Sequence, residues 1–113
     1  YSLLYAVLRN LMENSIRYAG PGAEIFLECY RHEAETLYFR YYDTGAGVPE
    51  EHLPRLFERF YRVSEGRTRE AGGTGLGLSI VRNAVQMHGG TITVRNRKGG
   101  GLEFLFTLRE TSR

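Results

Sequence analysis

The sequence contains only one cysteine, Cys29, so no disulfide bond can form within the chain. Cys29 lies in a strand-like run, and we therefore expect it to be a core thiol. No apolar run approaches the roughly 20 residues that cross a bilayer, and no signal peptide is visible. Internal repeats and low-complexity tracts are also missing. The composition, with 42% hydrophobic and 25% charged residues, is that of an ordinary soluble globular protein.

Long basic runs are absent too, which argues against nucleic acid as a partner. The net charge is +2, and of 15 basic residues all but Lys98 are arginine. Arginine favours bidentate contact with phosphate or carboxylate, although such a bias can equally be genomic. The 113 residues are enough for one core, so we expect one domain spanning residues 1–113. Because the chain begins at Tyr1 and directly in a helical pattern, we expect it to be a fragment of a longer protein.

Apolar residues at helical spacing predict a first helix over residues 1–18, which "AGPG" ends. Asn10, Asn14 and Arg17 are predicted to lie together on one side of this helix. The opposite, apolar arc is predicted to consist of Leu4, Leu8, Leu11, Met12, Ser15 and Ile16.

Alternating apolar residues predict two hairpins: "EIFLECYR" joined to "TLYFRYYD" by "HEAE", and "TITVRN" joined to "LEFLFTLR" by "RKGGG". Between the hairpins lie a polar loop, residues 63–73, and a second helix, residues 76–88. The side chains of this helix that are expected to face the core are those of Leu78, Val81 and Val85, with Ile80 beside them. Each sheet and each helix has one apolar face to cover. The fold class is therefore predicted to be α+β, a two-layer α/β sandwich with helices on one face of a mixed, largely antiparallel sheet.

The asparagines of the first helix suggest a metal–phosphate site. Amide oxygens are neutral, hard ligands, and a magnesium ion that carries nucleotide phosphates takes only one or two ligands from the protein. Asn14 can fill that role without repelling phosphate, and Arg17, nearly one turn on, could hold phosphate charge. The alternative is a solvated polar face in which Glu13 and Arg17 form an ordinary i,i+4 pair.

Asp43 ends a strand and is followed by a glycine turn, "DTGAGVP". A carboxylate accepts hydrogen bonds and would select a ring with an exocyclic amino group, such as adenine. Gly45 and Gly47 would let the backbone approach a flat ring closely. Two alternatives stay open: a tight turn capped by aspartate, and the Asp-Thr-Gly-Ala signature of retroviral-type aspartic proteases.

The stretch "GGTGLGLSIV" introduces the second helix with glycines. Free N–H groups and the helix dipole at such a start form an anion site that suits a polyphosphate. Purely structural glycines are the alternative.

These four motifs, in this order and including "LFERFYR", resemble the catalytic and ATP-binding domain of sensor histidine kinases. "NLMENSIRYAG" resembles the family's N box, "DTGAGVP" and "GGTGLGLSIV" its two G boxes, and "LFERFYR" its F box. The family belongs to a superfamily with the gyrase, heat-shock chaperone and mismatch-repair ATPases. The resemblance covers nearly the whole chain and implies a Bergerat-type ATP-binding fold, with ATP and Mg²⁺ as cofactors.

The resemblance also implies residue roles. Asn14 would ligate magnesium with support from Asn10, and Asp43 would bind the adenine amino group. The catalytic group would be Asn10, Asn14, Arg17 and Arg62, with Arg67 and Arg69 as further cations of the lid loop. The residues that would contact the nucleotide or anchor the lid are Asn14, Arg17, Tyr18, Asp43, Gly45, Gly47, Val48, Phe57, Phe60, Tyr61, Thr74, Gly75, Leu76, Gly77 and Leu78.

One position separates kinase from ATPase within the resemblance. The hydrolytic relatives carry a water-activating glutamate four residues before the metal asparagine, where this chain has Asn10, and an amide cannot serve as a general base. We therefore expect a protein-histidine kinase domain that delivers the γ-phosphoryl group to a histidine in an upstream dimerisation domain. The implied partners are that domain and a response regulator receiver domain. The implied parent is a membrane-anchored homodimer with this domain in the cytoplasm, and the fragment itself is expected to be monomeric. A non-catalytic nucleotide-sensing or docking module is the remaining alternative.

Overall fold

The computed structural model describes residues 2–59 and 77–109, without the side chains of Ser2 and Tyr18. In chain order its elements are α1 (Ser2–Tyr18), β1 (Ile25–Glu33), β2 (Thr36–Asp43), the 3-10 helix η1 (Glu50–Arg55), α3 (Gly77–Met87), β3 (Ile92–Asn96) and β4 (Leu102–Arg109). No helix among the described residues combines the length and the apolarity needed to span a bilayer.

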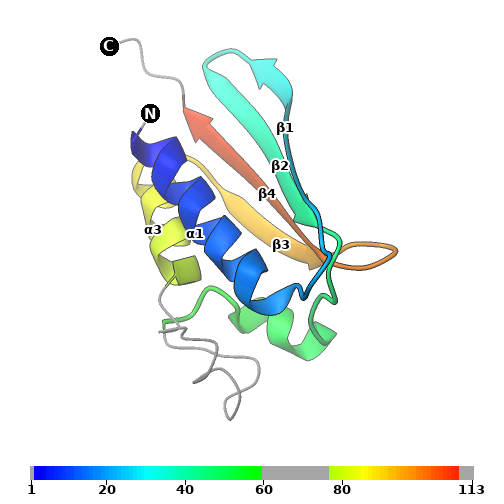
Figure 1. The fold of residues 1–113 in the computed structure, drawn as a ribbon. Helices are drawn as coiled ribbons and strands as arrows, with labels where there is room; N and C mark the ends of the chain where they lie inside the picture. The colour runs from blue at the N-terminus through cyan, green and yellow to red at the C-terminus, as the bar shows by residue number, and fades with distance from the viewer. Residues whose placement is uncertain (1, 60–76, 110–113) are drawn as a thin grey trace.

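The described residues form a sheet of four strands in the order β1-β2-β4-β3, and α1 and α3 lie side by side on one of its faces (Figure 1). This confirms the predicted α+β, two-layer sandwich. Every pairing of the described strands is antiparallel, so the mixed character that was expected is not seen there. Both hairpins join the strands that the alternation predicted, and β2 and β4 have the predicted bounds.

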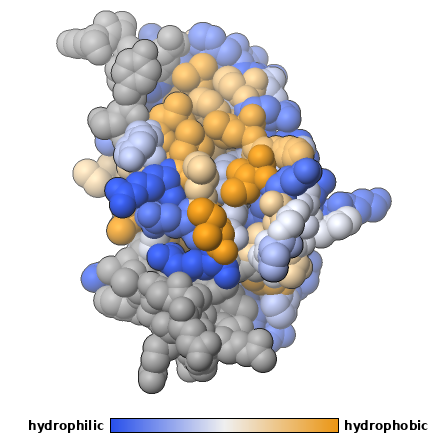
Figure 2. Space-filling model, viewed as in Figure 1, coloured by the Kyte–Doolittle hydropathy of each residue, from blue (hydrophilic) through white to orange (hydrophobic). Residues whose placement is uncertain are grey.

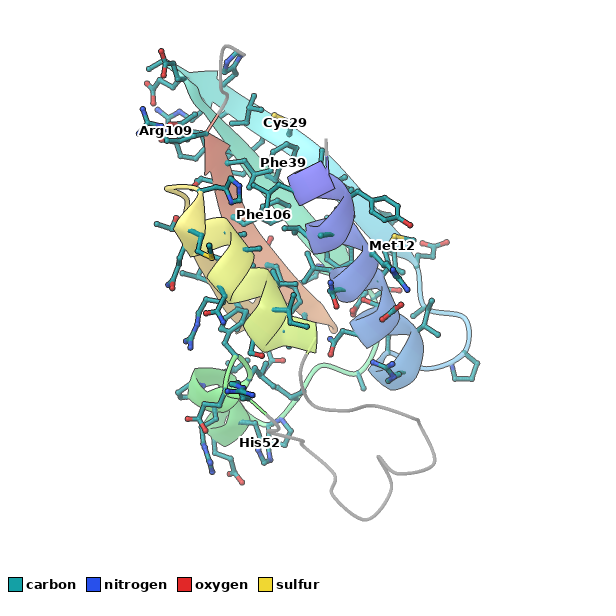
Figure 3. The ribbon with its side chains drawn as sticks, turned by 90° about the vertical axis from the view of Figure 1, so that its left-hand side faces the viewer. Met12, Cys29, Phe39, His52, Phe106 and Arg109 are labelled. Carbon is teal, nitrogen blue, oxygen red and sulfur yellow. The ribbon has the colours of Figure 1, made fainter. Side chains whose placement is uncertain are left out.

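The core lies between the helices and the sheet. Phe39 of β2 and Phe106 of β4 stack there with ring centroids 5.1 Å apart (Figure 3). Apolar side chains of β4 at every second position are buried against the helices, because successive residues of a strand face opposite sides.

The buried face of α1 is rotated from the predicted one. Val7 and Leu11 are fully buried, whereas Met12 and Ile16 are 45% and 73% exposed. The predicted inward position of Met12 and Ile16 was therefore wrong. The reason is that α1 packs against α3 as well as against the sheet, so its core-facing arc is centred nearer the asparagines. Asn10 lies partly buried at the border of the core, not opposite it.

The face of α3 follows the prediction with one exception. Leu78, Val81 and Val85 are buried, but Ile80 is 48% exposed because it lies about 100° around the helix from Val81. Ser79, which was not expected inside, is buried.

β1 is an edge strand that the helices leave largely uncovered. Its Leu27 pairs with Tyr41 and its Cys29 with Phe39, so these β1 residues share the helix-facing side of the sheet. Leu27 is nevertheless 43% exposed, and Cys29 is exposed. The core thiol was therefore a wrong prediction, because alternation gives the face of a residue but not whether that face is covered. Figure 2 shows apolar side chains exposed over α1 and the strands beside it.

The other face of the sheet holds a buried carboxylate, Glu103 of β4. Its side chain is 2% exposed and forms ion pairs with Arg40 of β2 and Arg95 of β3. Burial alone would raise the pKa of Glu103, but hydrogen bonds from Arg40 and Arg95 lower it overall. This three-strand ion cluster ties β2, β4 and β3 together.

Candidate functional site

Asp43 occupies the last position of β2 and is only 3% exposed. Its Oδ1 accepts hydrogen bonds from the backbone N–H groups of Gly45 (3.1 Å) and Leu102 (3.2 Å). Its Oδ2 accepts one from the Ser15 hydroxyl of α1, at 2.8 Å. The carboxylate therefore joins the end of β2, the turn after it, the start of β4 and the first helix.

A small cavity lies directly beside this carboxylate. Its walls bring together the carboxamide of α1 and the turn that follows β2, as the lining residues show: Asn14, Ala19, Asp43, Gly47, Val48 and Leu102. Its volume is about 10 Å³, room for about one water molecule. Four of the predicted site residues, Asn14, Asp43, Gly47 and Val48, thus meet at one place although they are up to 34 positions apart in the sequence.

Two glycines allow the turn after Asp43 to pack closely. A Cβ on Gly45 would lie 2.4 Å from the Cβ of Ala19, so only glycine lets the turn contact the end of α1. Gly47 has a φ of +73°, a conformation that residues with side chains rarely adopt. These observations explain why the turn needs glycine at both positions.

Asn96 at the end of β3 fixes the same turn. Its Oδ1 accepts a hydrogen bond from the Val48 N–H at 3.0 Å, and its Nδ2 donates to the Val48 carbonyl at 2.7 Å. Asn96 was not predicted from the sequence as part of the site, and neither were Ser15, Ala19 and Leu102. Ser15 carried a usable signal, because it is a polar residue within an apolar helical arc.

Asn10 lies where α1 meets the start of α3. Its Nδ2 donates to the carbonyl of Ala6 at 2.8 Å, and its Oδ1 would be 3.4 Å from a Cβ built on Gly77. The structure therefore places the first asparagine of the N box against the described end of the second glycine motif. Leu78, next in that motif, is buried.

Two other predicted residues lie away from the small cavity. Arg17 is exposed and lines a separate, open depression of about 440 Å³ together with Ile16, Pro21 and Ile25. Phe57 is buried, with its ring edge-on to Phe104 at 6.2 Å. The predicted site residues outside the described part of the chain are Phe60, Tyr61, Arg62, Arg67, Arg69, Thr74, Gly75, Leu76 and the side chain of Tyr18.

Sequence comparison identifies the family of this chain. Residues 1–112 match the family described as "Histidine kinase-, DNA gyrase B-, and HSP90-like ATPase". The "Sensor protein SrrB" of Staphylococcus aureus (strain NCTC 8325 / PS 47) is 46% identical over 103 residues, which are 90% of this chain and 17% of that protein. The chain thus spans a small part of the length of this relative.

Solved structures of similar fold give the same assignment. The "Mycobacterial sensor histidine kinase MprB" superposes with a TM-score of 0.79 at 26% identity, covering 96% of this chain and 72% of that one. The catalytic domain of histidine kinase ThkA superposes with a TM-score of 0.78 at 30% identity, covering 97% and 68%. Full-length ShkA in complex with AMPPNP has a TM-score of 0.75 at 27% identity, covering 98% of this chain and 22% of that one.

None of these comparisons supports the aspartic protease that Asp43-Thr44-Gly45-Ala46 suggested. Asp43 instead belongs to a sheet that α1 and α3 cover, with a carboxamide beside it. The chain belongs to the histidine kinase-, DNA gyrase B- and HSP90-like ATPase family, and it is a domain of the sensor histidine kinase type.

Proposed function

We propose that this domain binds Mg-ATP at the cavity beside Asp43 and supplies the γ-phosphoryl group for transfer to a histidine in a separate dimerisation domain. The proposal rests on one observation: Asn14 and Asp43 line the same cavity. Asn14 would be a neutral metal ligand there, and Asp43 a buried hydrogen-bond acceptor. Membership of an ATPase family and the AMPPNP complex of ShkA, a structural neighbour, support nucleotide binding.

Asp43 would accept a hydrogen bond from the exocyclic amino group of adenine. Guanine presents a carbonyl oxygen at the corresponding position, and two acceptors facing each other repel, so the carboxylate would select ATP over GTP. Gly45 and Gly47 would lie beside the ring. Because the cavity holds about one water molecule, we expect the Gly47–Val48 turn to shift outward when a purine binds.

The residues present fit magnesium as a cation held by few protein ligands. The described residues include no group of three or more His, Cys, Asp or Glu side chains that could hold a metal, so a carboxylate cage is not formed there. Magnesium bound through substrate phosphates needs only one or two protein oxygens, which Asn14 would supply with Asn10 beside it. The ion would neutralise phosphate charge, and Arg17 would add a further cation.

Transfer, not hydrolysis, is the reaction that these residues favour. Asn10 stands where the hydrolytic relatives carry a glutamate, and an amide cannot take a proton from water. The domain would therefore hold ATP until an acceptor histidine arrives, with catalysis by positioning and charge neutralisation. The proposed partners are an upstream dimerisation domain and a response regulator receiver domain, in a membrane-anchored, homodimeric parent whose cytoplasmic portion includes this domain.

A titration with ATP, ADP and GTP in the presence of magnesium tests the proposal. We expect ATP and ADP to bind, GTP to bind poorly, and the fragment alone to hydrolyse almost nothing. Asp43→Asn should abolish the preference for adenine, and Asn14→Asp should change the magnesium dependence, because it adds a charge next to phosphate. Exposed Glu35→Gln and Asn83→Asp are matched controls that should bind as wild type.

Rapid ATP turnover by the fragment would contradict the kinase assignment. Binding of ATP together with no phosphoryl transfer to an added dimerisation domain would favour a nucleotide-sensing module instead. Equal affinity for ATP and GTP in the wild type would remove Asp43 from its proposed role.

A further inference from the structure

Three buried side chains form a continuous hydrogen-bonded chain that ends at the proposed adenine acceptor. The Tyr41 hydroxyl lies 2.9 Å from the Ser15 Oγ, which lies 2.8 Å from Asp43 Oδ2. Tyr41 is 1% exposed, and Ser15 and Asp43 are each 3% exposed. Ser15 comes from α1 and the other two residues from β2, so the chain crosses the layer between helix and sheet.

The direction of these hydrogen bonds follows from which of the three groups can donate a proton. A carboxylate only accepts, so the single hydroxyl proton of Ser15 is donated to Asp43 Oδ2. Tyr41 must then donate its own proton to the Ser15 oxygen. Burial raises the pKa of Tyr41 to about 12, and the nearby Asp43 charge acts in the same direction, whereas the hydrogen bond to Ser15 lowers the pKa in part. Tyr41 therefore keeps its proton and remains a donor at neutral pH.

Counting acceptor positions shows where a ligand would bind the carboxylate. A carboxylate offers about four lone-pair positions, two on each oxygen. Among the described residues, Oδ1 accepts from the N–H groups of Gly45 and Leu102, and Oδ2 accepts from Ser15 alone. The one position that no described residue fills is on Oδ2, the oxygen that accepts the Ser15 hydrogen bond.

We propose that Ser15, supported by Tyr41, is a positioning residue that directs the remaining lone pair of Asp43 Oδ2 toward an exocyclic amino group of the bound purine. This inference rests on the proposed function. A purely structural role is the competing explanation, but alanine would fill the same position of α1 without burying a hydroxyl and with a higher helix propensity.

Two nucleotides that differ only in the amino group separate these explanations. ATP and purine riboside 5′-triphosphate, which lacks the amino group, would be titrated with magnesium into wild type and Ser15→Ala by calorimetry. We expect Ser15→Ala to weaken ATP binding on the order of tenfold, the effect of one hydrogen bond to a charged group, and to leave purine riboside triphosphate binding within about twofold.

Further variants separate a change in nucleotide preference from a loss of protein stability. Tyr41→Phe should reduce the preference for ATP in the same direction but by less, because Ser15 still donates to Asp43. The double variant Ser15→Ala/Tyr41→Phe leaves no orphaned hydroxyl, so it should be more stable than Ser15→Ala while showing the same nucleotide preference. Val85→Ala opens the core beside Gly90, away from Asp43, and should lower stability without changing the preference.

A loss of affinity that is equal for the two nucleotides, or no loss for either, would overturn the inference and leave the proposed function standing. A wild type that binds both nucleotides equally would instead refute the amino-group contact of Asp43 itself.

Discussion

Gly101, directly before β4, is the position where one methyl group should damage the fold and the site together. Its φ is +93°, and a Cβ built on it would lie 1.9 Å from the backbone oxygen of Asp43 and 2.8 Å from its Oδ1. Carbon atoms do not approach oxygen that closely, so Gly101→Ala must displace the end of β2 or the start of β4. Either movement changes the setting of the Asp43 carboxylate.

The expected loss in the free energy of unfolding has two contributions, and a variant at a neighbouring glycine measures one of them alone. Forcing a residue with a Cβ into left-handed backbone costs about 1–2 kcal/mol, and overpacking a close contact costs about 1–3 kcal/mol. Gly101→Ala should therefore lower the free energy of unfolding by about 2–5 kcal/mol. Gly99 has a φ of +99°, and a Cβ added to it would meet no atom within 4 Å, so Gly99→Ala should show the backbone part alone.

Urea unfolding of wild type, Gly99→Ala and Gly101→Ala measures both parts, and a nucleotide titration in the absence of urea measures the effect on the site. We expect Gly101→Ala to lose its preference for ATP over GTP and Gly99→Ala to keep it. Equal stability and equal nucleotide preference in the two variants would refute the reasoning, because a Cβ at position 101 meets Asp43 and a Cβ at position 99 meets no atom within 4 Å.

Two further predictions concern other parts of the molecule. Glu103→Gln should lower the free energy of unfolding at pH 7 by about 1–3 kcal/mol, because it removes a buried, doubly ion-paired carboxylate. The folded-state pKa of Glu103 is lowered, so its stabilisation is present above the pKa of an unfolded glutamate and is lost as pH falls through the folded value. The deficit of the variant, measured by denaturant unfolding from pH 7 to pH 3, should therefore shrink on the acid side. Exposed Cys29 should react with Ellman's reagent in the native protein as fast as in the unfolded one, and strong protection would contradict the uncovered edge of β1.

The periodicity of apolar residues predicted the helices and strands well because it reports the local geometry of the backbone. The two strands β2 and β4 begin and end where the alternation did, and α3 begins and ends within one residue of the prediction. It failed where burial depends on a distant neighbour. Met12 and Ile16 are as apolar as Leu11, and only the packing of α1 against α3 and the sheet decides which of them is covered.

The same difference between local pattern and distant contact decides which site residues could be predicted. Asp43 and Asn14 were predicted because each stands in a motif whose spacing is visible in the sequence, and they line one cavity. Ser15 and Asn96 were missed because their contacts join residues 28 and 48 positions apart, to Asp43 and to Val48. No local pattern encodes such a pair, although a polar residue in an apolar helical arc is reason to look for a buried partner.

Asp43 links fold and function more closely than the motif alone suggests. Within the described part of the chain its carboxylate accepts three hydrogen bonds from separate segments, so Asp43→Asn places an amide NH₂ where donors already point and leaves one of them unpaired. The variant should therefore lose stability as well as adenine preference, and its affinity must be measured per folded molecule. Ligand binding supplies an internal check, since ATP at 100 times its Kd should stabilise the wild type by about 2.7 kcal/mol. If Asp43 acts on the base, ATP and GTP should stabilise Asp43→Asn equally, even where both stabilise it less than ATP stabilises the wild type.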